Sequence, residues 1–547
     1  MCKKFNLFVR STILVILLIL NMKQTLTASA LPHLRKQGTA MQLIVDGKPF
    51  LMIAGELGNS TASSLEAMQP VWPKLVQLNL NTLLAPVYWE LLEPEENQFD
   101  FSLVDGLITE ARKHNLHLVL LWFGSWKNSM SCYAPCWVKA DQERFPRTEN
   151  AAGESQEILS CFSEENWKAD QKAFAALMRH VKETDGREHT VIMVQVENEI
   201  GMIPDARDHS KRADHCFRQP VPPTLMDYLK KKEDALIPEF KEVWENAGAK
   251  TSGSWQDIFG TGPGTDEIFM AWYYARYVEA VASAGKMEYA LPMYVNAALI
   301  RPGYQPGQYP SAGPLPHLMD IWRAGAPSID FLSPDIYFPN FSEWCQKYHR
   351  AGNPLFIPEV GRGNMAAVNI YYALGQHDAM GYSPFSIEST DSPIDDPIGQ
   401  SYLLVSQIAP LILEKQGKGM MRGILVDEET PEKRTTLGAY EFVCSHEYTS
   451  KWTYRASGDE WPRKGCLIIQ ISENEYFIAG SGVIITFEPA AEGAFIAGIG
   501  SLDEGNFVDG KWTPGRRMNG DQSHQGRHMR LSHWEHTIQK AVLYRYQ

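Results

Sequence analysis

The chain has 547 residues, which is more than a single hydrophobic core usually supports, so two domains are expected. Its composition, 44% hydrophobic and 21% charged, is that of an ordinary soluble globular protein. The formal net charge of −14 argues against nucleic acid as a partner, because phosphate binding needs clustered Lys and Arg.

The first thirty residues have the pattern of an export signal. Lys3, Lys4 and Arg10 precede a short apolar stretch from Ile13 to Leu20, and Ala28-Ser29-Ala30 provides a small-residue cleavage site. The apolar stretch is too short to span a bilayer comfortably. We therefore predict a signal peptide over 1–30, a periplasmic or extracellular protein, and no stable membrane insertion.

Apolar strands then alternate with helical patterns along most of the chain. Residues 42–57 predict a hairpin that turns at Asp46-Gly47 and leads into a first strand. Further strands are predicted at 81–89, 116–124, 190–197, 292–299, 331–337, 354–360 and 382–388. Amphipathic stretches after Ser163, at 265–286 and at 363–379 predict helices between them. Eight such repeats predict an α/β fold, a closed (β/α)8 barrel over 31–415.

Two segments depart from this alternation. Residues 202–264 are rich in charge, Pro and Gly, and they predict an insertion beside the barrel mouth, either a wall of a cleft or a mobile surface loop. After a helix at 396–414, short alternating strands separated by Gly, Asp and Asn predict an all-β sandwich over 416–547. We expect that domain to pack against the barrel; the alternative is an independent carbohydrate-binding module.

Two of the buried strands end in carboxylates. Residues 191–201 read V-I-M-V-Q-V-E-N-E-I-G, so an apolar strand ends in Glu197, Asn198 and Glu199. Residues 354–361 deliver Glu359 in the same way. In barrel enzymes the C-terminal ends of the strands carry the catalytic residues. Two such carboxylates suggest the acid and the second carboxylate that glycoside hydrolysis requires.

This arrangement resembles a large clan of (β/α)8 retaining glycosidases. In that clan an Asn-Glu pair ending strand four holds the acid/base, and a Glu ending strand seven is the nucleophile. The resemblance implies that Glu199 is the acid/base, that Glu359 is the nucleophile, and that Asn198 binds the sugar 2-hydroxyl. Glu197 lies one residue back on a strand of period two, so it is expected to be structural.

Within the clan, Q-V-E-N-E-I-G and the segment N-T-L-L-A-P-V-Y-W-E-L-L-E-P-E-E-N-Q-F-D-F resemble motifs of glycoside hydrolase family 35, the β-galactosidases. The resemblance covers roughly 40–415. The chain departs from it where Pro86 stands in place of a sugar-contacting tyrosine, which moves Tyr88 to the other strand face. The stretch F-G-S-W-K-N-S-M-S-C-Y-A-P-C-W also replaces a glycine-rich one. Both departures are compatible with the same reaction type, but they leave the identity of the sugar open.

Four further residues are candidate sugar-binding residues. Tyr337 could hydrogen-bond the nucleophile or be a core tyrosine. Trp126 and Asn128 could line the pocket or simply pack, and Tyr88 remains a candidate on its displaced face.

The expected function is that of an exported, exo-acting retaining β-galactosidase whose partner is a carbohydrate with terminal galactose. Another sugar specificity (β-glucosidase or α-L-arabinopyranosidase) and a non-catalytic sugar-binding barrel are the alternatives. Neither a cofactor nor a metal is expected. Cys132 and Cys136 have no second ligand pair nearby, and seven cysteines beyond Cys2 show no disulfide framework. The oligomeric state is left open.

Overall fold

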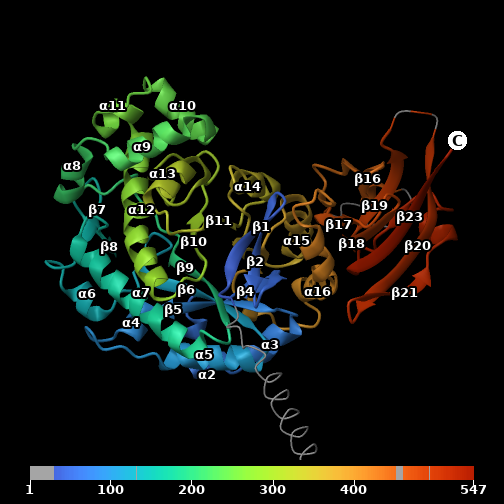
Figure 1. The fold of residues 1–547 in the computed structure, drawn as a ribbon, viewed down its shortest axis with the longest axis horizontal. Helices are drawn as coiled ribbons and strands as arrows, with labels where there is room; N and C mark the ends of the chain where they lie inside the picture. Colours follow the sequence, from blue (N-terminus) through green and yellow to red (C-terminus); the bar gives the residue numbers. More distant parts are fainter. Residues whose placement is uncertain (1–29, 131, 451–459, 492, 494) are drawn as a thin grey trace, which may run out of the picture.

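The structure is a computed structural model that describes residues 30–130, 132–450, 460–491, 493 and 495–547 (Figure 1). The predicted signal peptide lies outside the described residues. In those residues no helix combines the length and apolarity that crossing a membrane would need.

The predicted eight-stranded barrel is confirmed. Its strands run parallel and close in sequence order, so that the first strand pairs with the last. They are β4 (Met52–Glu56), β5 (Thr82–Tyr88), β6 (His117–Lys127), β9 (Val191–Asn198), β10 (Met293–Ala298), β11 (Phe331–Ile336), β12 (Ile357–Val360) and β13 (Gly381–Pro384). All eight are buried along their whole length or all but one residue, which explains why their sequences are apolar runs and not alternating ones.

The predicted helices surround the barrel. They are α7 (Glu164–Asp185), α12 (Pro263–Glu288), α15 (Asn364–His377) and α16 (Pro397–Lys415). In α7 the side chains of Phe174, Leu177, Met178 and Val181 are all buried, as their helical spacing predicts.

A small antiparallel sheet precedes the barrel and is joined to its last helix. It consists of β1 (His33–Gln37), β2 (Ala40–Val45) and β3 (Lys48–Phe50). The side-chain amides of Gln37 and Gln42 both donate to the carbonyl of Leu413, at 2.9 and 2.7 Å. These bonds satisfy a carbonyl in the last turn of α16, which has no partner within the helix.

The insertion at 202–264 is a group of short helices, not a mobile loop. It contains α8 (Lys211–Phe217), α9 (Pro223–Lys232), α10 (Pro238–Asn246) and α11 (Trp255–Phe259). Figure 1 shows these helices gathered beside α12 and α13 (Met319–Gly325). Buried Trp244, Trp255 and Phe240 give the group an apolar core that is continuous with that of the barrel.

The predicted C-terminal β-sandwich is also present. A six-stranded antiparallel sheet has the order β14-β17-β18-β23-β20-β21, and a four-stranded one has the order β15-β16-β19-β22. Their bounds are β14 (Met421–Val426), β15 (Glu432–Leu437), β16 (Tyr440–His446), β17 (Lys464–Gln470), β18 (Glu475–Ser481), β19 (Val483–Pro489), β20 (Ile496–Val508), β21 (Lys511–Arg517), β22 (Met529–Arg530) and β23 (Thr537–Tyr546).

The part of the six-stranded sheet formed by β14, β17 and β18 is buried on both faces. In β17, Cys466 and Ile468 lie in the core between the two sheets, whereas Leu467 and Ile469 lie in the core shared with the barrel. This alternation follows from the period of two along a strand. The sandwich therefore packs on the barrel, against α15. This is the arrangement expected from the sequence, as opposed to an independent module.

One glycine pair makes that packing possible. A Cβ on Gly375 of α15 would lie 2.6 Å from the backbone nitrogen of Gly423 in β14, and a Cβ on Gly423 would lie 2.6 Å from the carbonyl oxygen of Tyr371. Any side chain at either position would push helix and strand apart.

Candidate active site

Two barrel strands bring the predicted carboxylates together. Glu199 directly follows β9, the fourth barrel strand, and Glu359 lies on β12, the seventh. Asp335 on β11 is the register partner of Glu359 on the neighbouring strand. One carboxyl oxygen from each of these three residues lies within 4.8 Å of the other two. The C-terminal mouth of the barrel thus holds a tight group of three carboxyl groups.

Three neutral groups donate hydrogen bonds to Glu359. Its Oε1 accepts from Nδ2 of Asn198 at 3.2 Å and from Nδ2 of Asn296 at 3.3 Å, and its Oε2 accepts from the Tyr337 hydroxyl at 2.8 Å. These donors hold both oxygens of the Glu359 carboxyl in place, and they include the contact expected of Tyr337.

Glu199 is held by its backbone in an unusual conformation. Its φ of 45° lies in the left-handed region, which a residue with a side chain adopts only at a cost. Its N–H donates to Oδ1 of Asn296 at 3.0 Å, and its carbonyl accepts from the Ser129 hydroxyl. These two bonds fix the end of β9 so that the Glu199 carboxyl faces Glu359.

The surroundings of Glu199 favour its protonated form. Burial and, to a smaller extent, the nearby charge of Glu359 raise the pKa of Glu199 to about 7, against the opposing effect of Lys127. A carboxylic acid with such a pKa can donate a proton near neutral pH.

We expect this pKa to appear in the pH dependence of catalysis. Below about pH 7 Glu199 holds its proton and can donate it; above that pH the proton is lost, so kcat/KM should fall along a basic limb near pH 7. The measurement is a pH profile of kcat/KM with a substrate that has a poor leaving group. A profile that stays flat up to pH 9 would contradict the role given to Glu199.

Lys127 orients the amide of Asn198. Its ammonium donates to Oδ1 of Asn198 at 2.7 Å, which leaves Nδ2 to face Glu359. The reverse orientation of the amide would place two donors, Nδ2 and the ammonium, against each other. A buried cation at the end of β6 therefore fixes the direction of the hydrogen bond to the candidate nucleophile.

Glu197 faces away from this group and is bound in a separate one. Its Oε2 accepts the N–H of Trp126 at 2.9 Å, and it lies against buried Asp170. A Cβ on Gly124 would come within 2.8 Å of Oε1 of Glu197, so only glycine fits there. Asp170 accepts from three further donors, Trp122, Ser125 and Tyr277.

Burial raises the pKa of Glu197 and also that of Asp170, so the pair holds a proton. Since Asp170 is the one with several donors, that proton belongs on Glu197. The Glu197→Gln variant keeps an acceptor for Trp126 and supplies an N–H for Asp170. We expect its kcat/KM to stay within about tenfold of the wild type, with a modest change in Tm by thermal unfolding. A loss of activity comparable to that of a Glu199 variant would mean that Glu197 is the catalytic member of the E-N-E motif.

Two of the candidate sugar-binding residues are buried among aromatic rings. Trp126 is 0% exposed and packs edge-on against Tyr274 and Tyr277 of α12, so it is a core residue outside the barrel strand. Tyr88 is 3% exposed and packs against Phe123 and Tyr133. It lies on the same face of β5 as Leu84, the register partner of Glu56, and therefore faces into the barrel. The strand pattern could not reveal this, because either face of a fully buried strand accepts an aromatic ring.

Asn128 remains a candidate. It directly follows Lys127 at the end of β6, has a left-handed φ of 56°, and is partly exposed. Its side-chain oxygen is buried and has no hydrogen-bond partner among the described residues. An unpaired buried acceptor is costly, and a sugar hydroxyl would satisfy it.

Sequence reasoning did not find four members of the site: Glu56, Lys127, Asn296 and Asp335. Three of them carried a usable signal, because each is a polar residue inside an apolar strand: M-I-A-G-E, P-M-Y-V-N and F-L-S-P-D-I-Y. Lys127 gave no such sequence signal, because it lies in a polar stretch that has the pattern of a loop.

The three carboxyl oxygens near Glu199 are also spaced closely enough to surround a cation. A cation would need all three groups ionised, whereas burial raises the pKa of both Glu199 and Asp335. The group therefore fits acid–base chemistry better than cation binding.

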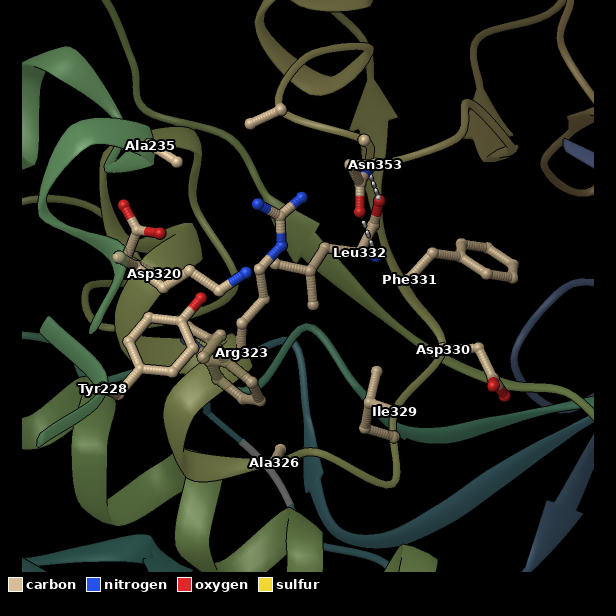
Figure 2. Close-up of a pocket in the computed structure, with 14 residues that line it drawn as sticks. Tyr228, Ala235, Asp320, Arg323, Ala326, Ile329, Asp330, Phe331, Leu332 and Asn353 are labelled. Carbon is tan, nitrogen blue, oxygen red and sulfur yellow. Dashed lines mark hydrogen bonds between the residues drawn. The ribbon is translucent and has the colours of Figure 1, made fainter. Parts of the chain in front are cut away.

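A separate cavity of about 240 Å³ lies elsewhere on the barrel. Figure 2 shows Tyr228 of α9, with Asp320 and Arg323 of α13, around it, beside the beginning of β11. This is the N-terminal end of the strand, opposite to the mouth. Asp320 accepts the N–H of Ile237 at 2.6 Å, just before α10. The cavity is thus part of the joint between the insertion and the barrel.

Comparison with known proteins supports the enzyme class. The family model described as β-galactosidase, glycoside hydrolase family 42, matches residues 66–267, and a domain of unknown function matches 398–530. A β-galactosidase from Xanthomonas manihotis is 28% identical over 202 residues, which cover 35% of this chain and 29% of that protein. These matches point to a glycoside hydrolase. The family 42 match includes Glu199 and ends before Glu359.

Solved structures support the fold. A catalytic mutant of a GH42 β-galactosidase from G. stearothermophilus is 11% identical, covers 93% of this chain and 100% of its own, and has a TM-score of 0.50. A β-galactosidase from Bacillus circulans sp. alkalophilus is 14% identical, with 66% and 57% covered and a TM-score of 0.45. The chain thus spans 29% of the curated relative and 57% of the latter structure.

The resemblance to family 35 is not supported; the family that matches is 42. The physical reason is that the E-N-E motif and the two strand-end glutamates describe the chemistry of the barrel mouth. That chemistry is shared across the whole clan, so short motifs around it do not separate one family from another.

Proposed function

We propose that the protein is an exo-acting retaining β-galactosidase, in which Glu199 is the acid/base and Glu359 is the nucleophile. The observation that carries the proposal is the position of these two carboxyl groups. They come from strands four and seven, and one oxygen of each lies within 4.8 Å of the other. Retaining glycosidases place their two carboxyl groups about 5–5.5 Å apart, whereas inverting ones leave about 6.5–9.5 Å for a water molecule.

In the first half of the reaction, Glu359 attacks the anomeric carbon while Glu199 gives its proton to the departing glycosidic oxygen. The donors on Glu359 hold its attacking oxygen in place: Tyr337 binds Oε2, and the amides of Asn198 and Asn296 bind Oε1. The result is a galactosyl ester on Glu359 and a free aglycone.

In the second half, Glu199 is ionised and removes a proton from a water molecule that attacks the anomeric carbon. The bond to Glu359 breaks, and galactose leaves with its original β configuration. Glu199 suits both halves because its pKa of about 7 lies near the pH at which it must give and accept a proton.

The choice of galactose is supported by the family model and the curated relative, both described as β-galactosidase. A panel of nitrophenyl glycosides tests it, and we expect the β-galactoside to have the highest kcat/KM. A preference for the β-glucoside or the α-L-arabinopyranoside would keep the mechanism and change the sugar. Binding of galactose without turnover of any glycoside would mean a sugar-binding barrel. Release of galactose alone from a galactan would support the exo mode.

A further inference from the structure

Beneath the two catalytic carboxyl groups lies another buried one, that of Glu56. Glu56 is the last residue of β4. The preceding residue, Gly55, faces outward, because a Cβ there would meet Ile387 and Leu80 at 2.7 and 2.8 Å. Successive residues of a strand point to opposite faces, so Glu56 points into the barrel. Its side chain is 0% exposed.

The Glu56 carboxyl lacks the donors that a buried carboxylate needs. Neither of its oxygens accepts a hydrogen bond from an N–H or O–H group among the described residues. An ionised carboxylate in such a place would be very costly, and the usual outcome is that the group keeps its proton. A carboxylic acid then needs an acceptor for its own O–H, and the carboxyl group of Glu359, on β12 against β4, is the charged group that acts most strongly on Glu56.

The charged groups around Glu56 come from several strands. Glu359 on β12, Asp335 on β11 and Glu199 after β9 all repel a negative charge on it. Lys127 at the end of β6 attracts such a charge and opposes protonation, but its ammonium is bound to Asn198. Burial and the carboxyl groups together outweigh the lysine, so the pKa of Glu56 lies well above its ordinary value.

We propose that Glu56 is a positioning residue whose carboxylic acid donates a hydrogen bond to Glu359 and so stabilises the charged form of the nucleophile. This inference rests on the function proposed above. It adds a fourth donor to the three described for Glu359. Unlike those three, this donor is an acid, and a hydrogen bond from an acid to a carboxylate is short and strong.

Two variants of Glu56 separate a neutral donor from a buried charge. Glu56→Gln keeps a donor of similar shape that cannot ionise, and Glu56→Leu removes the donor. We expect the Gln variant to retain kcat/KM within about tenfold and the Leu variant to lose on the order of 10²-fold, as when one donor to a reacting oxygen is removed.

The basic limb decides between the two charge states. If Glu56 is already neutral, replacing it removes no charge near Glu199, and the basic limb stays near pH 7 in both variants. If Glu56 is ionised, both variants remove a negative charge, and the basic limb moves to lower pH in both. That second result, or equal losses in the Gln and Leu variants, would overturn the proposal.

An infrared difference spectrum gives a readout that does not depend on catalysis. The wild type minus Glu56→Gln spectrum at pH 7 should contain the carbonyl stretch of a protonated carboxylic acid. A carboxylate band in its place would contradict the proposal even in an inactive protein. A wild type that hydrolyses no glycoside but shows the acid band would refute the proposed function and leave the protonation of Glu56 standing.

Discussion

Replacing Glu359 with Ala should lower turnover of every glycoside by on the order of 10⁶-fold, the loss measured when a covalent catalyst loses its nucleophile. The reason is that no galactosyl ester can form, so even a substrate with an excellent leaving group should not be turned over faster. Steady-state kinetics with aryl and unactivated galactosides measures the loss. The matched control is Glu343→Ala, because Glu343 lies at the surface, where it pairs with Lys347 and accepts a hydrogen bond from Asn340.

Added azide should restore part of the activity of the Glu359 variant. The small anion can occupy the space of the missing carboxylate and attack the anomeric carbon from the same side. The product should therefore be the α-galactosyl azide, which NMR identifies. A β-azide from this variant, or unchanged turnover, would show that Glu359 is not the nucleophile.

Replacing Glu199 with Ala should have a different pattern. Protonation of the leaving group contributes about 10²–10⁴-fold, so substrates with poor leaving groups should lose on that order. Activated aryl galactosides should be affected much less in the first step, since their leaving groups depart without a proton. The measurement is kcat/KM across a series of leaving groups, which should depend far more steeply on leaving-group pKa in the variant.

Azide should rescue the Glu199 variant with the opposite stereochemistry. Here the ester on Glu359 still forms, and azide replaces the water that Glu199 can no longer activate. The product should be the β-galactosyl azide. Equal losses on all substrates in both variants, with the same azide anomer from each, would refute the two roles assigned here.

The barrel was predictable from the sequence because its strands are buried on both faces. Each therefore appears as a continuous apolar run between helical patterns, and all eight were found within a few residues of their observed bounds. The two glutamates proposed to be catalytic were predictable for the same reason. A carboxylate that ends such a run, as Glu359 does, stands out against its apolar neighbours.

The grouping of the remaining site residues was not predictable, because it depends on which strands meet. Asn296 and Asp335 become site residues only when β10 and β11 are placed beside β9 and β12. Lys127 lies at the end of an eleven-residue strand that continues past the apolar run. Trp126 was misplaced because the strand continues there, which turns its ring into the aromatic core.

As the proposed nucleophile, Glu359 becomes covalently bonded to the sugar, and trapping that bond tests its role most directly. A 2-deoxy-2-fluoro-β-galactosyl fluoride slows both halves of the reaction while its leaving group still allows the first, so the ester accumulates. Peptide mass spectrometry of the inactivated protein should place one fluorogalactosyl group on the peptide that contains Glu359. A label on Glu199, on Asp335 or on Glu56, or continued turnover with no label, would contradict the account.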